Sequence, residues 1–166
     1  YEGFTTVQHG VMRIRNSSAL GSTNLGTVVN SGATLDVQNN ITVAEPLQIS
    51  GFGAQVTTAT NASRVGQGAL RNSQGDNTWT GTVVLLQANN TQHEITVDGG
   101  TSLDINARVT AAQNANPTGL VKAGLGTLRF SGSTTNDYTF TTTVVAGTLE
   151  LNKTGGGESG ASVWGN

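Results

Sequence analysis

Short segments of alternating apolar and polar residues recur along this chain. The clearest lies at Val144–Leu151, where Leu149 and Leu151 point to one side of an extended strand and Glu150 points to the other. Gly147 interrupts the segment at a position where two short strands meet at an angle, a bend that favours a residue without a Cβ atom. The pattern predicts a strand–turn–strand unit.

Copies of this unit occur at fixed spacings. Val7–Ile14 matches Val144–Leu151 at a sequence offset of 137, which places Gly10 on Gly147. Val29–Val37 aligns without gaps on Val97–Ile105 at an offset of 68, and neighbouring copies follow at spacings of 22 or 23. A period in the low twenties, built from short strands and glycine turns, predicts a β-solenoid in which one period makes one coil.

The repeats predict an all-β fold and one domain. Residues 1–154 are expected to form solenoid repeats of roughly seven coils, and residues 155–166 to form a Gly-rich C-terminal tail or the start of a further coil. No window shows the helical period of 3.6 residues. The alternation predicts a continuous interior made of Val29, Leu35, Val37, Val97, Leu103, Ile105, Val121, Leu128, Val144, Leu149 and Leu151. It predicts exposure for Thr34, Asp36, Asp104, Arg129 and Glu150.

Several phrases of the sequence resemble a known family, the autotransporter-associated β-strand repeat of bacterial surface proteins. They are GLVKAGLGTLRFSG (119–132), NDYTF (136–140), TTTVVAGTLELNK (141–153), NSSALGS (16–22), VVNSGATLDV (28–37), ITVAEPLQISG (41–51) and GALRNSQGDNTWTG (68–81). The resemblance covers most of the chain. It implies a right-handed parallel β-helix that is exported and displayed on the outer surface of a bacterial cell or beyond it.

Composition excludes several functions. Only 11% of the residues are charged, the net charge is −2, and no run of Lys or Arg could follow a phosphate backbone, so no nucleic-acid partner is expected. The chain has no cysteine for a disulfide or a thiolate metal site. It also lacks an apolar segment near the roughly 20 residues that span a bilayer, so no membrane insertion is expected.

Candidate chemistry is sparse, and no catalytic residue, cofactor or metal is predicted. Neither His9 nor His93 has an acidic residue at a ligand or triad spacing. Asp36 and Asp104 occupy matching repeat positions, where stacked carboxylates could bind calcium. Asp98 precedes Gly99 and Gly100, and the calcium-binding nonapeptide begins with two glycines. The third glycine of that motif is absent, so a solvated carboxylate is the favoured interpretation over calcium binding.

Three aromatic residues form a candidate binding surface. Trp79 and Tyr138 share an Asn-x-aromatic-Thr context, and Tyr1 joins them through the offset of 137. Such rings could stack against sugars on a glycan-binding face. An aromatic residue at a fixed repeat position is also typical of a side chain that fills a corner of the coil, and this second interpretation is favoured.

The expected function is a non-enzymatic structural module of a secreted or cell-surface protein: a stalk, an adhesin body or a head-to-tail extracellular fibre. A glycan-binding module is the first alternative, and a polysaccharide lyase or hydrolase the second, although the acidic residues are scattered. The expected partners are copies of the chain that stack end to end, or adjoining repeats of a longer chain, with glycans as a further possibility. Stacking would use the coils that carry Val7, Met12, Ile14, Val144, Leu149 and Leu151.

Overall fold

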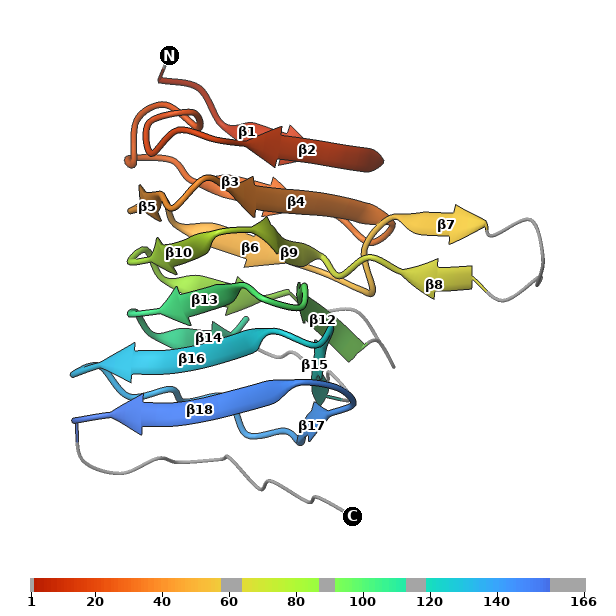
Figure 1. Cartoon of the computed structure of the whole chain (residues 1–166). Coiled ribbons are helices and arrows are strands. Elements are labelled where there is room, and N and C mark those ends of the chain that lie inside the picture. The colour runs from red at the N-terminus through yellow and green to blue at the C-terminus, as the bar shows by residue number, and fades with distance from the viewer. Residues whose placement is uncertain (1, 58–63, 87–91, 113–118, 156–166) are drawn as a thin grey trace.

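The structure is a parallel β-solenoid, seen in a computed structural model that describes residues 2–57, 64–86, 92–112 and 119–155. Strands stack along one axis, and the first and last described strands lie at opposite ends of the column (Figure 1). In the described part of the chain there is no helix, and hence none long and apolar enough to cross a membrane. The prediction of an all-β solenoid is confirmed.

Three parallel sheets form the sides of the column. Sheet A contains β1 (Thr5–Val7), β3 (Thr27–Val29), β6 (Leu47–Ile49), β11 (Val83–Leu85) and β14 (Val109–Ala111). Sheet B contains β2 (Gly10–Ile14), β4 (Ala33–Gln38), β9 (Leu70–Gln74), β12 (Gln92–Val97), β15 (Gly119–Ala123) and β17 (Thr142–Val144). Sheet C contains β5 (Thr42–Val43), β10 (Asp76–Trp79), β13 (Ser102–Ile105), β16 (Thr127–Gly132) and β18 (Thr148–Lys153). The chain visits the sides in the order A, B, C.

The column has about five turns, so the prediction of seven coils is wrong. Coils differ in length because connections of different size join the same three sides. Thr5 pairs with Thr27, a step of 22 in sequence number, whereas Leu47 pairs with Val83, a step of 36. The longer step contains an antiparallel hairpin, β7 (Gln55–Thr57) and β8 (Arg64–Gly66), which projects sideways from the column (Figure 1).

The core is a set of inward-facing ladders in which each residue stacks on its partner in the next coil. In sheet B, Leu35 stacks on Leu70, and Leu70 on Ile95. All three side chains are fully buried, and each contributes roughly 1.5–3 kcal/mol of hydrophobic stabilisation. Strands of neighbouring coils are hydrogen-bonded to each other, so their backbone N–H and C=O groups have partners without water. A narrow interior is therefore sufficient for this fold.

The predicted interior is largely confirmed. Val29, Leu35, Val37, Val97, Leu103, Ile105 and Leu128 are fully buried. Val121 is buried but lies outside the main core cluster, because the alternation of β15 places Lys122 in line with Ile95. Val144 and Leu149 are half-buried and Leu151 is 43% exposed, because these residues belong to the last coil.

Two residues predicted to be exposed are buried. Thr34 lies beneath the base of the hairpin insertion, where its hydroxyl donates to the Gly68 carbonyl (2.8 Å) and accepts the N–H of Ala54 (2.9 Å). Asp36 is 0% exposed although its carboxylate accepts from Arg13 on the neighbouring strand (2.8 Å). The prediction was wrong for both because an outer sheet face can be covered by insertions and long side chains. Asp104, Arg129 and Glu150 are half-exposed.

Matching sequence copies do not occupy matching sides of the column. Val29 lies in sheet A, but Val97, its partner at the offset of 68, lies in sheet B. The offset of 137 shows the same shift, because Val7 belongs to sheet A and Val144 to sheet B. The repeated unit is therefore one corner of the column, and it recurs at different corners.

Candidate assembly surfaces at the two ends of the solenoid

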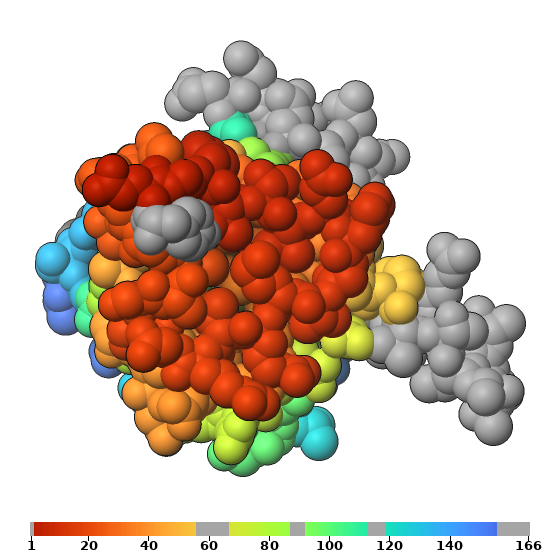
Figure 2. Space-filling view, turned by 90° about the horizontal axis from the view of Figure 1, so that it is seen from above, coloured from red at the N-terminus to blue at the C-terminus, as the bar shows by residue number. Residues whose placement is uncertain are grey.

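The first coil ends the column with the edge strands β1 and β2 and the segment 15–26, which connects β2 to β3 without a strand. Seen from this end, residues of the first coil cover most of the surface (Figure 2). Leu20 anchors the connecting segment in the core, where it is 3% exposed.

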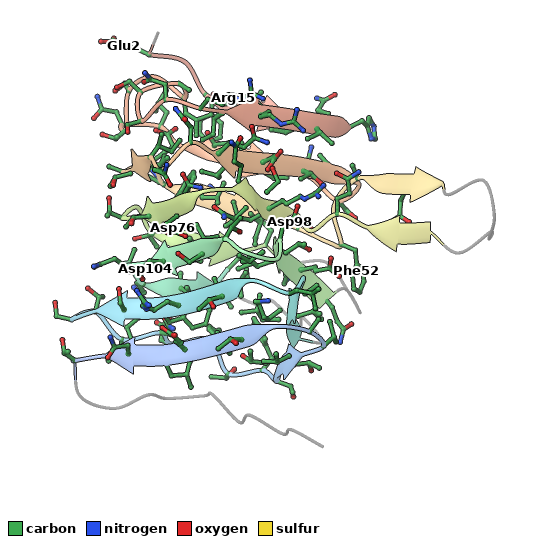
Figure 3. All side chains as sticks on the ribbon, viewed as in Figure 1. Glu2, Arg15, Phe52, Asp76, Asp98 and Asp104 are labelled. Carbon is green, nitrogen blue, oxygen red and sulfur yellow. The ribbon has the colours of Figure 1, made fainter. Side chains whose placement is uncertain are left out.

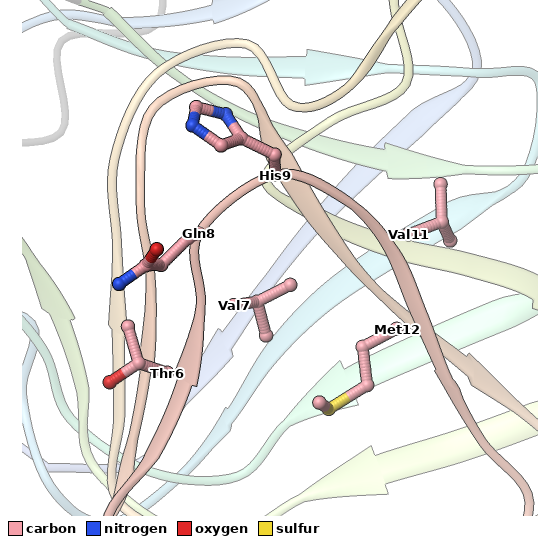
Figure 4. Close-up of a pocket in the computed structure, with 6 residues that line it drawn as sticks. All are labelled: Thr6, Val7, Gln8, His9, Val11 and Met12. Atoms are coloured by element: carbon pink, nitrogen blue, oxygen red, sulfur yellow. The ribbon is translucent and has the colours of Figure 1, made fainter.

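A hollow of about 480 Å³ opens at the corner between β1 and β2. Its lining residues are Thr6, Val7, Gln8, His9, Val11 and Met12. Val7 and Met12 point towards each other inside the corner, whereas Thr6, Gln8 and Val11 lie on its outer side (Figure 4). The floor of the hollow is thus apolar and its rim is mostly polar.

The last described coil of the column contains β17 and β18. Leu149 packs against the core from one side only, and Leu151 and Val145 are 43% and 62% exposed. Edge strands of this kind present backbone N–H and C=O groups to any strand that approaches. This end therefore combines apolar side chains with backbone groups that can pair.

Each end has strands on two sides and an irregular segment on the third, but the irregular side differs. In the first coil it is the sheet C side, since sheet C begins only at β5 in the second coil. In the last coil it is the sheet A side, where residues 133–141 stack on β14 without forming a strand. Two hydrogen bonds fix this placement: the Val109 N–H donates to the Asn136 side-chain oxygen (2.9 Å) and the Asp137 N–H to the Val109 carbonyl (3.2 Å).

Charged residues on the outer faces form ion pairs between neighbouring coils. Arg13 pairs with Asp36 at 2.8 Å, and Arg129 pairs with Glu150 at 2.6 Å. The hydrogen bond to Glu150 raises the pKa of Arg129. Arg13 on β2 and Glu150 on β18 belong to the two terminal coils, and their side chains are 50% and 43% exposed. The edge strand β2 thus carries the arginine of one ion pair, and the edge strand β18 carries the glutamate of another.

The candidate aromatic surface does not lie on the surface. Trp79 is 0% exposed, and its indole N–H donates to the Glu45 carbonyl (2.8 Å). Tyr138 is also buried; its ring stacks on Phe140 with centroids 5.0 Å apart, and its hydroxyl hydrogen-bonds to that of Thr142. Both rings fill the interior, so neither offers a face to a sugar. Tyr1 lies outside the described residues.

The Asn-x-aromatic context proves to be a structural motif. The Asn77 side-chain oxygen accepts the N–H of Ile41 (2.7 Å) from the preceding coil, as that of Asn136 accepts the N–H of Val109. In each case the asparagine ties an irregular stretch to the coil beside it, and the aromatic ring two residues later enters the core. The shared Asn-x-aromatic context thus reflects the packing of the core and the hydrogen bonds between coils.

Several buried ionisable residues were not identified from the sequence, among them Glu45, Glu94, His93 and Lys122. His93 on β12 is fully buried, and burial lowers its pKa to about 4. Lys122 on β15 is also fully buried, and its ammonium donates to the carbonyls of Ala123, Gly124 and Ala146. Burial lowers the pKa of Lys122 to about 8. The alternation of the strand could have indicated the burial of Lys122. Lys122 is two residues after Leu120, so both side chains point to the inward side of the strand.

The residues considered for calcium do not come together. Asp36 lies on β4 in sheet B and Asp104 on β13 in sheet C, while Asp98 pairs with Arg71 at 2.7 Å. Asp104 and Asp98 appear as separate labelled side chains in Figure 3. Within the ranges that the structure describes, no group of three or more His, Asp or Glu side chains could hold a metal ion.

Comparison with known proteins found no matching family model, no similar curated protein and no similar solved structure.

Proposed function

We propose that this chain is a non-enzymatic structural module that lengthens a column by end-to-end stacking. One observation carries the proposal: each described end presents edge strands around a strand–turn–strand corner, and both corners are versions of one sequence unit. A surface that stacks on its own repeats within the chain has the geometry to stack on another chain. The module would serve as a stalk, as the body of an adhesin or as the subunit of a fibre.

The polar residues support a structural role. The described ion pairs link neighbouring coils, and asparagine side chains tie irregular stretches to the ladder. These groups stabilise the column where they lie. The burial of Trp79 and Tyr138 removes the feature that favoured a glycan-binding surface.

The proposal also includes the cellular location of the protein. The resemblance of its repeats to autotransporter-associated β-strand repeats favours the outer surface of a bacterial cell or the space beyond it. The low fraction of charged residues, 11%, means that little repulsion opposes close stacking. The resemblance also favours a right-handed coil, as does the strong general preference of parallel crossover connections for that hand.

Sedimentation velocity and negative-stain electron microscopy of the purified chain at rising concentration test the proposal. We expect species heavier than a single chain, whose fraction grows with concentration, and rod-shaped particles that lengthen along the column axis. Monodisperse particles with the mass of one chain at millimolar concentration would refute it.

A matched pair of variants locates the contact. Leu151→Glu places a charge on the exposed end of the column and should suppress assembly. Leu125→Glu makes the same change at a residue that is 78% exposed on the turn between β15 and β16, one coil before the edge strands, and should leave assembly intact. Equal behaviour of the two variants would argue against stacking through the ends.

A further inference from the structure

The position of the irregular segments determines how two copies can meet. If a second copy followed with its sides aligned, β2 would lie on β17, but β18 would face residues 15–26 and β1 would face residues 133–141. Only one of three sides would then pair strand on strand. With aligned sides, β1 and β18 would therefore have no strand to pair with.

Rotation by one side of the column changes this outcome. The sheet A side of the next copy then lies on the sheet B side of the first, so that β1 meets β17 and β2 meets β18. The two irregular segments, residues 15–26 and 133–141, come to face each other on the remaining side. Both pairs of edge strands gain a partner, and both remain parallel.

We propose, building on the function above, that copies of this chain stack head to tail with a rotation of one side between successive copies. The register is set by the sequence offset of 137: Thr5 on Thr142, Val7 on Val144, Met12 on Leu149 and Ile14 on Leu151. The occupant of each end is thus a second copy of the chain. Contact between unlike ends does not close on itself, so it produces an open filament.

The inward side chains match in this register. The spacing from Val7 to Met12 across the first corner equals the spacing from Val144 to Leu149 across the last, so the register holds along both strands. The hollow between Val7 and Met12 then lies over the half-buried Val144 and Leu149. Stacking removes this apolar surface from water, as it does between coils within the chain.

The outward side chains match as well. Arg13 of the next copy falls on Glu150 of the first, because both lie one residue beyond an inward pair of the register. Within the chain, Glu150 pairs with Arg129 and Arg13 with Asp36, so the junction continues a ladder of alternating charge. With aligned sides Arg13 would face Val145 instead. Charge complementarity of this kind selects the register more than it adds affinity.

Engineered cysteines distinguish the two arrangements, since the natural chain contains none. Val11→Cys combined with Thr148→Cys places two sulfurs opposite each other in the rotated register, on neighbouring strands about 4.8 Å apart, which suits a disulfide. Val11→Cys combined with Thr143→Cys is the matched control for aligned stacking. These residues lie at opposite ends of the column, so either disulfide must join two copies.

We expect the first pair to give a ladder of covalent multimers on a non-reducing gel and the control pair to give little above monomer. Preferential linking of the control pair, equal linking of both, or assembly without linking of the first pair would each overturn the rotated register and leave the proposed function standing. Failure of the chain to associate at all would instead overturn the proposed function.

Mixing charge variants supplies a test that needs no oxidation. Arg13→Glu and Glu150→Arg should each self-associate several-fold more weakly than the natural chain, because each brings like charges together at its junctions. A mixture of the two should recover, because every junction between unlike variants again joins opposite charges. Urea unfolding of each variant checks that it remains folded. A folded mixture that gains nothing over its components would refute the register.

Discussion

His93 provides a test of the buried core through the pH dependence of stability. Its side chain faces inward from β12 and stacks on Leu120 of β15. Its Nδ1 atom accepts the N–H of Gly51 at 3.4 Å, and its Nε2 atom has no hydrogen-bond partner among the described residues. The imidazole is therefore held in the neutral form, and burial lowers its pKa to about 4 from an ordinary value of 6.5.

The expected effect follows from this difference in pKa. Between pH 6.5 and pH 4 the unfolded chain binds a proton at His93 that the folded chain does not, so stability falls as the pH falls. The loss is about 2 kcal/mol at pH 5 and approaches about 3 kcal/mol near pH 4. That is a large part of the roughly 5–15 kcal/mol typical of a folded domain.

Urea unfolding, followed by the fluorescence of the buried Trp79, measures the effect. His93→Leu removes the titrating group and also the bond from Gly51, and the second loss is the same at every pH. The difference in unfolding free energy between the natural chain and the variant should therefore shift by about 2 kcal/mol, in favour of the variant, between pH 7.5 and pH 5. His9→Gln, which replaces an exposed histidine, is the comparison variant. A constant difference across this range would show that His93 is not buried as neutral imidazole.

Three further predictions concern packing, backbone and the second buried base. Leu103→Ala should cost about 2–5 kcal/mol in urea unfolding because it empties a fully buried site, whereas Leu125→Ala should cost almost nothing. Gly53→Ala should destabilise far more than Gly10→Ala by thermal unfolding: both glycines have positive φ, but only at Gly53 would a Cβ lie 2.1 Å from a backbone oxygen. Burial lowers the pKa of Lys122 to about 8, so between pH 8 and pH 10.5 the unfolded chain binds a proton at Lys122 that the folded chain does not. The free energy of unfolding should therefore rise with pH across this range, and Lys122→Met should abolish that rise.

The sequence predicted the class of fold because alternation and glycine turns are local signals. Leu35, Leu103 and Ile105 sit in period-two segments, and each is fully buried as expected. The number of coils was not predictable from the shortest spacing. Residues 51–68 lack the alternation of the repeats, which favours a loop that leaves the coil, but their sequence does not reveal the antiparallel pairing of β7 with β8 or how much length it adds to one coil.

Burial of charged residues depended on neighbours that are remote in sequence. Asp36 alternates outward as predicted, but Arg13 and Arg71 lie on the strands either side of it, and the Gln38 amide donates to its carboxylate (3.2 Å). Lys122 is tolerated inside because three carbonyls from two successive corners converge on its ammonium. Neither arrangement can be recognised before the register between coils is known.

The shift between sequence repeats and sides of the column has a physical cause. A corner requires an inward residue, a residue that adopts positive φ and a second inward residue, whichever two sides it joins. Gly10 and Gly32 occupy corners between sheets A and B with φ of 75° and 88°, and Gly100 and Gly147 occupy corners between sheets B and C with φ of 78° and 69°. The requirements at these corners are the same, so their sequences converge and local similarity does not identify the side. Only hydrogen bonds between coils distinguish the sides within one chain. At the proposed junction between two chains no covalent connection imposes the choice, and we infer from the position of strands, apolar side chains and charges that the rotated arrangement is favoured.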